Sequence, residues 1–195
     1  DAIPIEKDAV ILMTGGLGGI GLTLAERLGR DYGAKIGFVA RSPLPPRETW
    51  DEVLRTVSTN SAKARRIRGL QAVEAAGGEV MVLEADVSNP VEMNAAVEAM
   101  TERWGNIQGV IHAAGAIDDA PILSKESYSV DTVLTAKVQG TQVLSDLFPD
   151  GALDWMVLFS SVSTVTAPAG QVDYVAANEY LNAVAQSRQG GKTKV

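Results

Sequence analysis

The stretch AVILMTGGLGGIGLTLAERLGR, residues 9–30, joins a short apolar run, a glycine-rich turn and an amphipathic segment. Residues 9–13 are all apolar and lead directly into the turn, as is typical of a buried parallel strand. After the turn, apolar side chains recur with helical spacing, for example at Leu24 and Leu28. The order strand, glycine loop, helix is the context in which such a loop indicates a nucleotide-binding site.

The glycine loop is suited to hold a pyrophosphate, because a backbone without side chains can approach an anion at a helix N-terminus. Gly16, Gly18 and Gly21 fit the spacing G-x-G-x-x-G. Gly15, Gly19 and Gly21 fit the spacing T-G-x-x-x-G-x-G. A glycine-rich turn without a ligand is the alternative. We therefore expect a dinucleotide along the whole loop, formed by Gly15, Gly16, Leu17, Gly18, Gly19, Ile20 and Gly21.

The end of the second expected strand, residues 35–40, bears on the type of cofactor. A dinucleotide without a 2′-phosphate would favour Asp or Glu about 20 residues beyond the loop. This chain has Arg41 and Ser42 there. A guanidinium fork and a hydroxyl suit a phosphate, which predicts NADPH rather than NADH. The alternative is that Arg41 is merely solvated at the strand end.

The rest of the chain alternates apolar runs with helical patterns. Further strands are expected at 79–83, 107–112 and 155–159, and helices at 61–76, 90–104 and 127–147. This alternation predicts an α/β fold, a Rossmann-like doubly wound parallel sheet with helices on both faces. Residues 43–60 interrupt it as a proline-rich insertion with a short amphipathic segment. The basic helix that follows has either a docking face or a solvated surface.

Composition limits the function. The 195 residues, with a net charge of −7, suit a single domain and argue against a nucleic-acid partner. Without cysteine and with one histidine, a thiol nucleophile, a disulfide framework or a Cys/His metal site is not expected. No apolar run approaches the ~20 residues of a membrane span, so we expect no membrane partner and a cytoplasmic location. The start at Asp1 suggests a fragment of a longer chain.

A second motif, FSSVSTVTAPAGQVDYVAANEYLN at residues 159–182, is typical of an active site. An apolar run ends at Ser160 and Ser161, and a helical pattern after the loop carries Tyr174 and Asn178. The i, i+4 spacing places the last two on one helix face. A serine at a strand end and a tyrosine on the next helix can converge on one substrate oxygen.

Several other polar residues admit two interpretations. Asp86 can reach an adenine edge or stabilise its turn. His112 lies on an apolar strand and is expected to be buried and structural rather than a base. Asp118 and Asp119 suggest acid–base or metal chemistry, but adjacent carboxylates rarely face one point, so a loop role is expected. The interest of Lys137 depends on whether its helix face turns toward the tyrosine.

These motifs together resemble the short-chain dehydrogenase/reductase family, and within it the ketoreductase domain of a modular polyketide synthase. They are TGGLGGIG at 14–21, ARS at 40–42, ADV at 85–87, HAAG at 112–115, AKVQG at 136–140, FSS at 159–161 and YVAAN at 174–178. Most members carry Tyr-x-x-x-Lys and an earlier Asn. Here Asn178 and Lys137 are exchanged, as in the synthase ketoreductases. Ser161 lies thirteen positions before Tyr174, as in the family, which favours it over Ser160.

The resemblance implies reduction of a β-ketoacyl thioester by NADPH. The substrate would be carried by the phosphopantetheine of an acyl carrier protein. Tyr174 would donate the proton, assisted by Ser161 and Lys137, with Asn178 holding a water or the lysine in the relay. Beyond the glycine loop and Arg41, the expected cofactor residues are Ser42, Asp86, Val87, Ala113, Ala114, Gly115, Lys137 and Tyr174.

The resemblance extends to stereochemistry. Ile117-Asp118-Asp119 resembles the LDD-type loop of B-type domains, which form the D-configured hydroxyl. Thr166, rather than tryptophan, stands eight positions before the tyrosine, and Ala176, rather than proline, stands two positions after it. These residues favour the B1 subtype. The candidate stereocontrol residues are Asp118, Asp119 and Gln171.

The same resemblance implies partners and alternatives. The other domains of one synthase would be partners, and the segment would stop before the last strands and the lid of the family. The ending GGKTKV is typical of a turn and the start of a strand. The alternatives are a ketoreductase of a fatty acid synthase, a free-standing NADPH reductase, and a non-reducing structural domain of a megasynthase.

Overall fold

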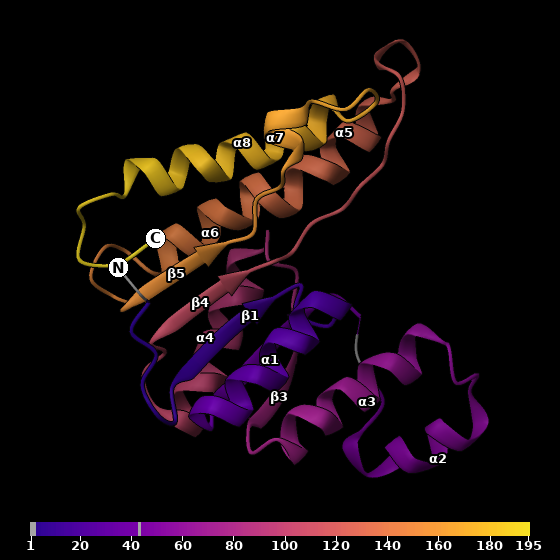
Figure 1. The fold of residues 1–195 in the computed structure, drawn as a ribbon, viewed down its shortest axis with the longest axis vertical. Helices are drawn as coiled ribbons and strands as arrows, with labels where there is room; N and C mark the ends of the chain where they lie inside the picture. Colours follow the sequence, from indigo (N-terminus) through magenta and orange to yellow (C-terminus); the bar gives the residue numbers. More distant parts are fainter. Residues whose placement is uncertain (1–2, 43) are drawn as a thin grey trace.

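The computed structural model describes residues 3–42 and 44–195, and within them a five-stranded parallel sheet has the order β3-β2-β1-β4-β5 (Figure 1). The strands are β1 (Val10–Thr14), β2 (Lys35–Ala40), β3 (Glu79–Glu84), β4 (Gly109–His112) and β5 (Trp155–Leu158). The chain runs outward from β1 to β3, returns to β4 beside β1, and continues to β5. This topology confirms the predicted Rossmann-like doubly wound sheet.

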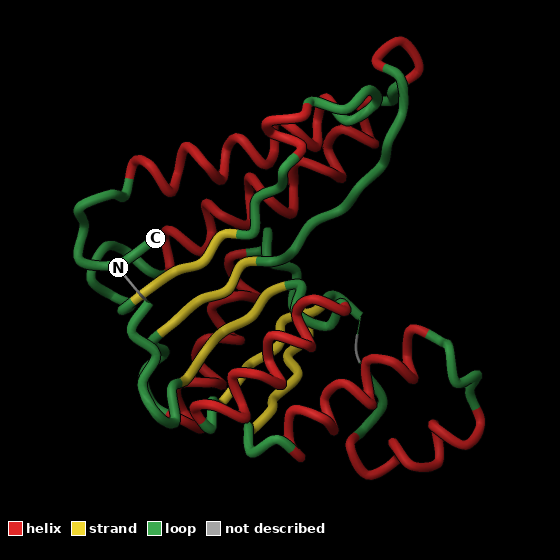
Figure 2. Tube along the Cα trace, viewed as in Figure 1, coloured by secondary structure: helices red, strands yellow, loops and turns green. Residues whose placement is uncertain are grey.

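Helices cover both faces of the sheet (Figure 2). The first half contributes α1 (Gly19–Tyr32), the short η1 (Arg47–Thr49), α2 (Trp50–Thr56), α3 (Ala62–Ala75) and α4 (Pro90–Trp104). The second half contributes η2 (Ile122–Ser124), α5 (Ser127–Leu134), a π-helical turn η3 (Thr135–Gln139), α6 (Gly140–Leu147), α7 (Ser163–Thr166) and α8 (Val172–Ser187). None of the helices in the described ranges is both long and apolar enough to cross a bilayer.

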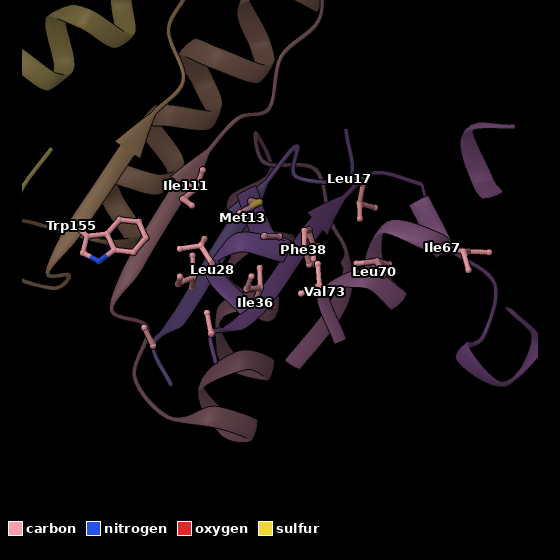
Figure 3. Packing of buried hydrophobic residues seen from close by; sticks show 14 of the residues in the cluster. Met13, Leu17, Leu28, Ile36, Phe38, Ile67, Leu70, Val73, Ile111 and Trp155 are labelled. Atoms are coloured by element: carbon pink, nitrogen blue, oxygen red, sulfur yellow. The ribbon is translucent and has the colours of Figure 1, made fainter. Parts of the chain in front are cut away.

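The central strand supplies both cores, because successive side chains of a strand point to opposite faces. Ile11 and Met13 pack with α1 and α3 in the cluster drawn in Figure 3. Val10 and Leu12 pack on the other face, where α4 and α6 contribute apolar side chains. All five residues of β1 are buried. The strand is therefore apolar almost throughout, as a parallel strand covered on both faces must be.

Capping residues in the sequence define two of the helix starts. Ser61 caps α3, since its hydroxyl accepts the N–H of Ala64 at 3.1 Å. Asn89 caps α4 by accepting the N–H groups of Val91 and Glu92, and Pro90 occupies the first helical position. Both helices therefore start within one residue of the predicted bounds.

The predicted insertion forms η1 and α2 and packs on α3; residue 43, its first, lies outside the described residues. Trp50 is buried, and its indole N–H donates to the carbonyl of Pro45 at 2.9 Å. The Arg47 guanidinium lies 4.3 Å from the centre of the Trp50 ring and pairs with Glu74 of α3. The insertion thus packs against α3 and is held to it by the ion pair between Arg47 and Glu74.

Two details differ from the sequence-based expectation. The helix expected at 127–147 is continuous but contains the π-helical turn η3 at its middle. Strand β4 begins at Gly109, two residues later than expected. At the other end of the chain, Lys194 forms a parallel bridge with Trp155. The start of a strand expected in GGKTKV is therefore present beside β5.

Two strand glycines lead to a test of the packing. A Cβ at Gly109 would lie 2.1 Å from the ring of Trp155, which is rigid and buried, whereas one at Gly37 would meet the flexible side chain of Met100. We expect Gly109→Ala to lower the free energy of unfolding by about 1–3 kcal/mol. Gly37→Ala, its matched control, should cost less. Urea denaturation measures both, and an equal or reversed order would contradict the packing described.

Candidate active site

The strand order reverses between β1 and β4, and a cavity of about 450 Å³ opens at the carboxyl ends of the strands there. Its walls come from the glycine loop, the ends of β2 and β3, the segment after β4, and α5 with η3. The lining residues are Thr14, Gly15, Leu17, Gly18, Val39, Ala40, Arg41, Ser42, Arg66, Ala85, Asp86, Val87, Ala114, Gly115, Ala116, Asp131, Thr132, Thr135 and Ala136.

Packing within the protein, rather than a ligand, requires glycine at two positions of the loop. Gly15 has φ of +67°, and a Cβ there would lie 2.5 Å from the amide nitrogen of Ala114. A Cβ at Gly21 would lie 2.4 Å from the carbonyl oxygen of Gly16. These contacts join the loop to the end of β4 and to the first turn of α1. They set the shape of the crevice, whether or not a ligand is bound.

Two other glycines are not explained by packing. Apart from the adjacent residues and the backbone of α1 itself, a Cβ at Gly18 would have its nearest described neighbour at 3.8 Å, and one at Gly19 would have none within 4 Å. Helix α1 begins at Gly19, so its free N–H groups and dipole face the loop. A bare backbone beside open space at a helix N-terminus fits a pyrophosphate. Of the other predicted loop residues, Leu17 is buried and Ile20 is exposed.

The ends of β2 and β3 form the wall expected to hold the adenosine. Arg41, Ser42, Asp86 and Val87 all line the cavity. The Asp86 carboxylate accepts the N–H and hydroxyl of Ser88 at 2.9 and 2.7 Å. Partial burial raises its pKa, but the hydrogen bonds from Ser88 and the charge of Arg41 outweigh this and lower it. Asp86 therefore stabilises its turn and also borders the cavity.

His112 is buried and structural in its contacts, as the sequence indicates. Its Nδ1 lies 2.6 Å from the hydroxyl of Thr14 on the neighbouring strand. Burial lowers the pKa of His112 to about 4, and the positive charge of Lys137 acts in the same direction. The ring is therefore neutral near pH 7, and it joins β1 to β4 just below the crevice.

Lys137 lies in the π-helical turn, and its face turns toward the strand ends. The side chain is buried, and Nζ donates to the carbonyl oxygen of Phe159 at 2.8 Å. Its Cε would lie 3.1 Å from a Cβ at Gly115, so the lysine side chain packs closely on this glycine. Burial lowers the pKa of Lys137 to about 8. The amine therefore lies between the end of β4 and the end of β5.

Helix α8, which carries Tyr174 and Asn178, packs against both α5 and η3, the turn that holds Lys137. The amide of Asn178 is fully buried and donates to the carbonyl of Tyr174 at 2.7 Å. Its Oδ1 has no hydrogen-bond partner among the described residues. Ser160 donates to the carbonyl of Asn178 at 3.3 Å, while the Ser161 hydroxyl accepts the N–H of Ser163 at 3.1 Å.

Two regions therefore meet at one edge of the sheet. The cavity lining holds most of the expected cofactor residues, whereas Ser161, Tyr174 and Asn178 lie on the segment after β5. Lys137 lies between them, next to the lining residue Ala136 and hydrogen-bonded to Phe159. Of the expected cofactor residues in the described chain, Gly16, Gly19, Ile20, Gly21, Ala113, Lys137 and Tyr174 do not line the cavity itself.

A buried ion pair beside Tyr174 was not expected from the sequence. Lys125 Nζ lies 2.7 Å from Asp173 Oδ2, and the two side chains are 3% and 2% exposed. Lys125 also donates to the carbonyl of Asp118. In the same region Gln171 donates to Asp119 at 2.8 Å. The loop that contains Asp118 and Asp119, called the acidic loop below, is thus attached at two points to the start of α8.

Neither the π turn nor the ion pair has a usable signal in the sequence. The helical apolar pattern continues through 135–139, so the wider turn leaves no local mark. Lys125 and Asp173 are 48 positions apart, and no spacing rule connects them. Both features depend on tertiary packing.

Comparison with known proteins agrees with this geometry. The family model described as the KR domain matches residues 9–195. The chain is 37% identical over 187 residues to 6-methylsalicylic acid synthase of Aspergillus terreus, covering 94% of this chain and 10% of that protein. It is 33% identical over 189 residues to 5-methyl-1-naphthoate synthase of Streptomyces sahachiroi, covering 97% of this chain and 10% of that protein. The chain thus spans about a tenth of these relatives.

Solved structures show the same likeness. An N-terminal ketoreductase from the macrolactin assembly line is 33% identical with a TM-score of 0.80, over 96% of this chain and 35% of that one. A ketoreductase domain from the bacillaene assembly line is 32% identical with a TM-score of 0.80, over 97% and 42%. The chain belongs to the KR domain family, as a polyketide-synthase ketoreductase domain of the short-chain dehydrogenase/reductase superfamily.

Proposed function

We propose that this domain uses NADPH to reduce a β-ketoacyl thioester, held on the phosphopantetheine of an acyl carrier protein, to the β-hydroxyacyl thioester. The observation that carries the proposal is the position of Lys137. Its buried amine is hydrogen-bonded to the Phe159 carbonyl and lies beside Gly115, where it joins the cofactor cavity to the helix of Tyr174. A nicotinamide cofactor follows from the family.

The residues of the chain fit the cofactor. Gly18 and Gly19 leave open backbone at the start of α1 for the pyrophosphate. Arg41 and Ser42 line the cavity where a 2′-phosphate would lie. Gly115 lines the cavity next to the Lys137 side chain, where a ribose would lie. When bound, the cofactor supplies the hydride that adds to the ketone carbon.

Tyr174 is the proton donor in this proposal. A phenol has an unperturbed pKa of about 10, so it exchanges a proton slowly near neutrality without help. In this proposal the charge of the Lys137 ammonium would assist Tyr174 in giving up its proton. Ser161 and Tyr174 would donate hydrogen bonds to the oxygen as negative charge develops on it. Asn178, with a buried and unpaired Oδ1, is placed to accept a hydrogen bond in the proton relay.

The stereochemical outcome proposed is the D-configured hydroxyl of the B1 type. Two contacts support a specific role for the acidic loop, namely Gln171 with Asp119 and Lys125 with the carbonyl of Asp118. Both attach the loop to residues near Tyr174. Held in this way, the loop would limit the side from which a substrate ketone meets the tyrosine.

The partners proposed are an acyl carrier protein and the other domains of one synthase. The curated relatives are synthases of which this chain covers about a tenth, so a ketoreductase unit in them works among other domains. A non-reducing structural domain is disfavoured, because the glycine loop, Lys137 and Tyr174 are all present in the arrangement described.

Replacement of the tyrosine hydroxyl tests this assignment. We expect Tyr174→Phe to lower turnover of a β-ketoacyl pantetheine thioester by roughly 10²–10⁴-fold, because the proton donor is lost. The affinity for NADPH should remain within about threefold of the wild type, since general acid catalysis contributes to the chemical step rather than to cofactor binding. Tyr180→Phe, on the same helix, is the control and should keep its activity. Turnover of Tyr174→Phe equal to that of the control would refute the role.

The buried lysine predicts a pH dependence. Below about pH 8 the Lys137 amine is charged and would assist proton donation by Tyr174; above it the amine is neutral and this assistance is lost. We therefore expect kcat/KM for reduction to fall as pH rises through about 8. NMR of lysines labelled at Cε, with Lys137→Met to assign the signal, measures the titration directly. A Lys137 signal that titrates near the ordinary value of 10.5 would contradict the described burial.

A further inference from the structure

We propose that Arg66 on α3 is a second cation of the subsite that holds the cofactor's 2′-phosphate, an inference that rests on the proposed use of NADPH. Arg66 lines the same cavity as Arg41 and Ser42, although it lies on a different element and 25 positions after Arg41 in the chain. The Arg66 side chain is partly buried. The site would take a phosphate monoester on the adenosine ribose.

The other basic residues of this helix are directed elsewhere. Arg65 donates to the carbonyl of Asn60, and Arg68 donates to the carbonyl of Thr59 at 2.9 Å, so both fold back on the preceding loop. Lys63 is exposed. The helix surface is therefore divided: two guanidinium groups hold the loop of the insertion, and Arg66 faces the cavity. A uniformly solvated basic face does not describe this arrangement.

Close packing of α3 on α1 places Arg66 near the glycine loop. A Cβ at Gly69 would lie 2.5 Å from Leu22 Cδ1, so glycine permits the approach of the two helices at this point. Leu22 is in the first turn of α1, and Arg66 and Gly69 share one face of α3 at i, i+3 spacing. Arg66 therefore lies on the side of α3 that packs on α1, and it lines the cavity together with Gly18 and Arg41.

The carboxylates around Arg41 favour a second cation in this subsite. A neighbouring cavity is lined by Arg41 together with the carboxylates of Glu84, Asp86 and Glu92. A phosphate monoester carries about −1.5 to −2 charges at pH 7. With Arg41 as the only cation, the phosphate dianion would lie close to these three carboxylates, which would repel it. A second guanidinium, able to form a bidentate contact with phosphate, restores a positive subsite.

The test compares the binding of NADPH and NADH to the intact domain by isothermal titration calorimetry. Arg66→Ala should weaken NADPH binding by roughly tenfold to a hundredfold, the effect of losing a charge-assisted contact, and change NADH binding by less than about twofold. Arg65→Ala removes the same charge from the same helix and is the matched control, with both affinities expected to be unchanged. Arg66→Met keeps the aliphatic stem and should behave like Arg66→Ala.

The outcomes separate this inference from the proposed function. A wild-type preference for NADPH that Arg66→Ala and Arg66→Met both reduce, while Arg65→Ala keeps it, supports the inference. If both Arg66 variants bind NADPH as tightly as Arg65→Ala does, the inference is overturned although NADPH use stands. If the Arg66 variants weaken NADH and NADPH equally, Arg66 has only a structural role and the inference is again overturned. A wild type that binds NADH as tightly as NADPH overturns the cofactor assignment and the inference together.

Discussion

The parallel pairing of β1 with both β2 and β4 is the constraint on which the rest of this domain depends. The pairing buries β1 at the centre of the sheet. The connection that follows β1 leads to β2 on one side, whereas β4, which follows β3 in the chain, lies on the other side. The crevice forms between β1 and β4, where the strand order reverses. Gly15 stands at that point, and its close approach to Ala114 leaves space for no other residue. The position of the crevice is therefore determined by the topology of the sheet and not by the functional side chains.

Three separate elements carry the groups that are proposed to function at this edge of the sheet. The glycine loop offers backbone amides at the start of α1, η3 brings the Lys137 amine to the end of β5, and α8 carries Tyr174. π-Helical turns are rare in proteins, and those that occur are often found at functional sites. Here it accompanies the burial of a charged amine, which its contact with the Phe159 carbonyl partly compensates. The Lys125–Asp173 pair then fixes the start of α8 against the acidic loop.

The part of this architecture that follows local rules could be predicted from the sequence. The order of strand, glycine turn and helix at residues 9–30, the doubly wound sheet and the buried position of His112 depend on short-range patterns and were predicted correctly. The π turn, the Lys125–Asp173 pair and the position of Arg66 were not, because they arise from contacts between segments far apart in the chain. The four basic residues of α3 illustrate the difference: they look alike in the sequence, and only packing on α1 separates Arg66 from Arg65 and Arg68.

The crevice and the tyrosine helix, acting together, are proposed to carry out hydride transfer to a ketone. The most direct test uses NADPH deuterated at C4 of the nicotinamide, a β-ketoacyl pantetheine thioester and mass spectrometry of the product. We expect a β-hydroxyacyl thioester that carries one deuterium on the carbon bearing the new hydroxyl, from one of the two C4-labelled epimers. A hydroxyacyl product without deuterium from either epimer, or no hydroxyacyl product, would contradict this mechanism.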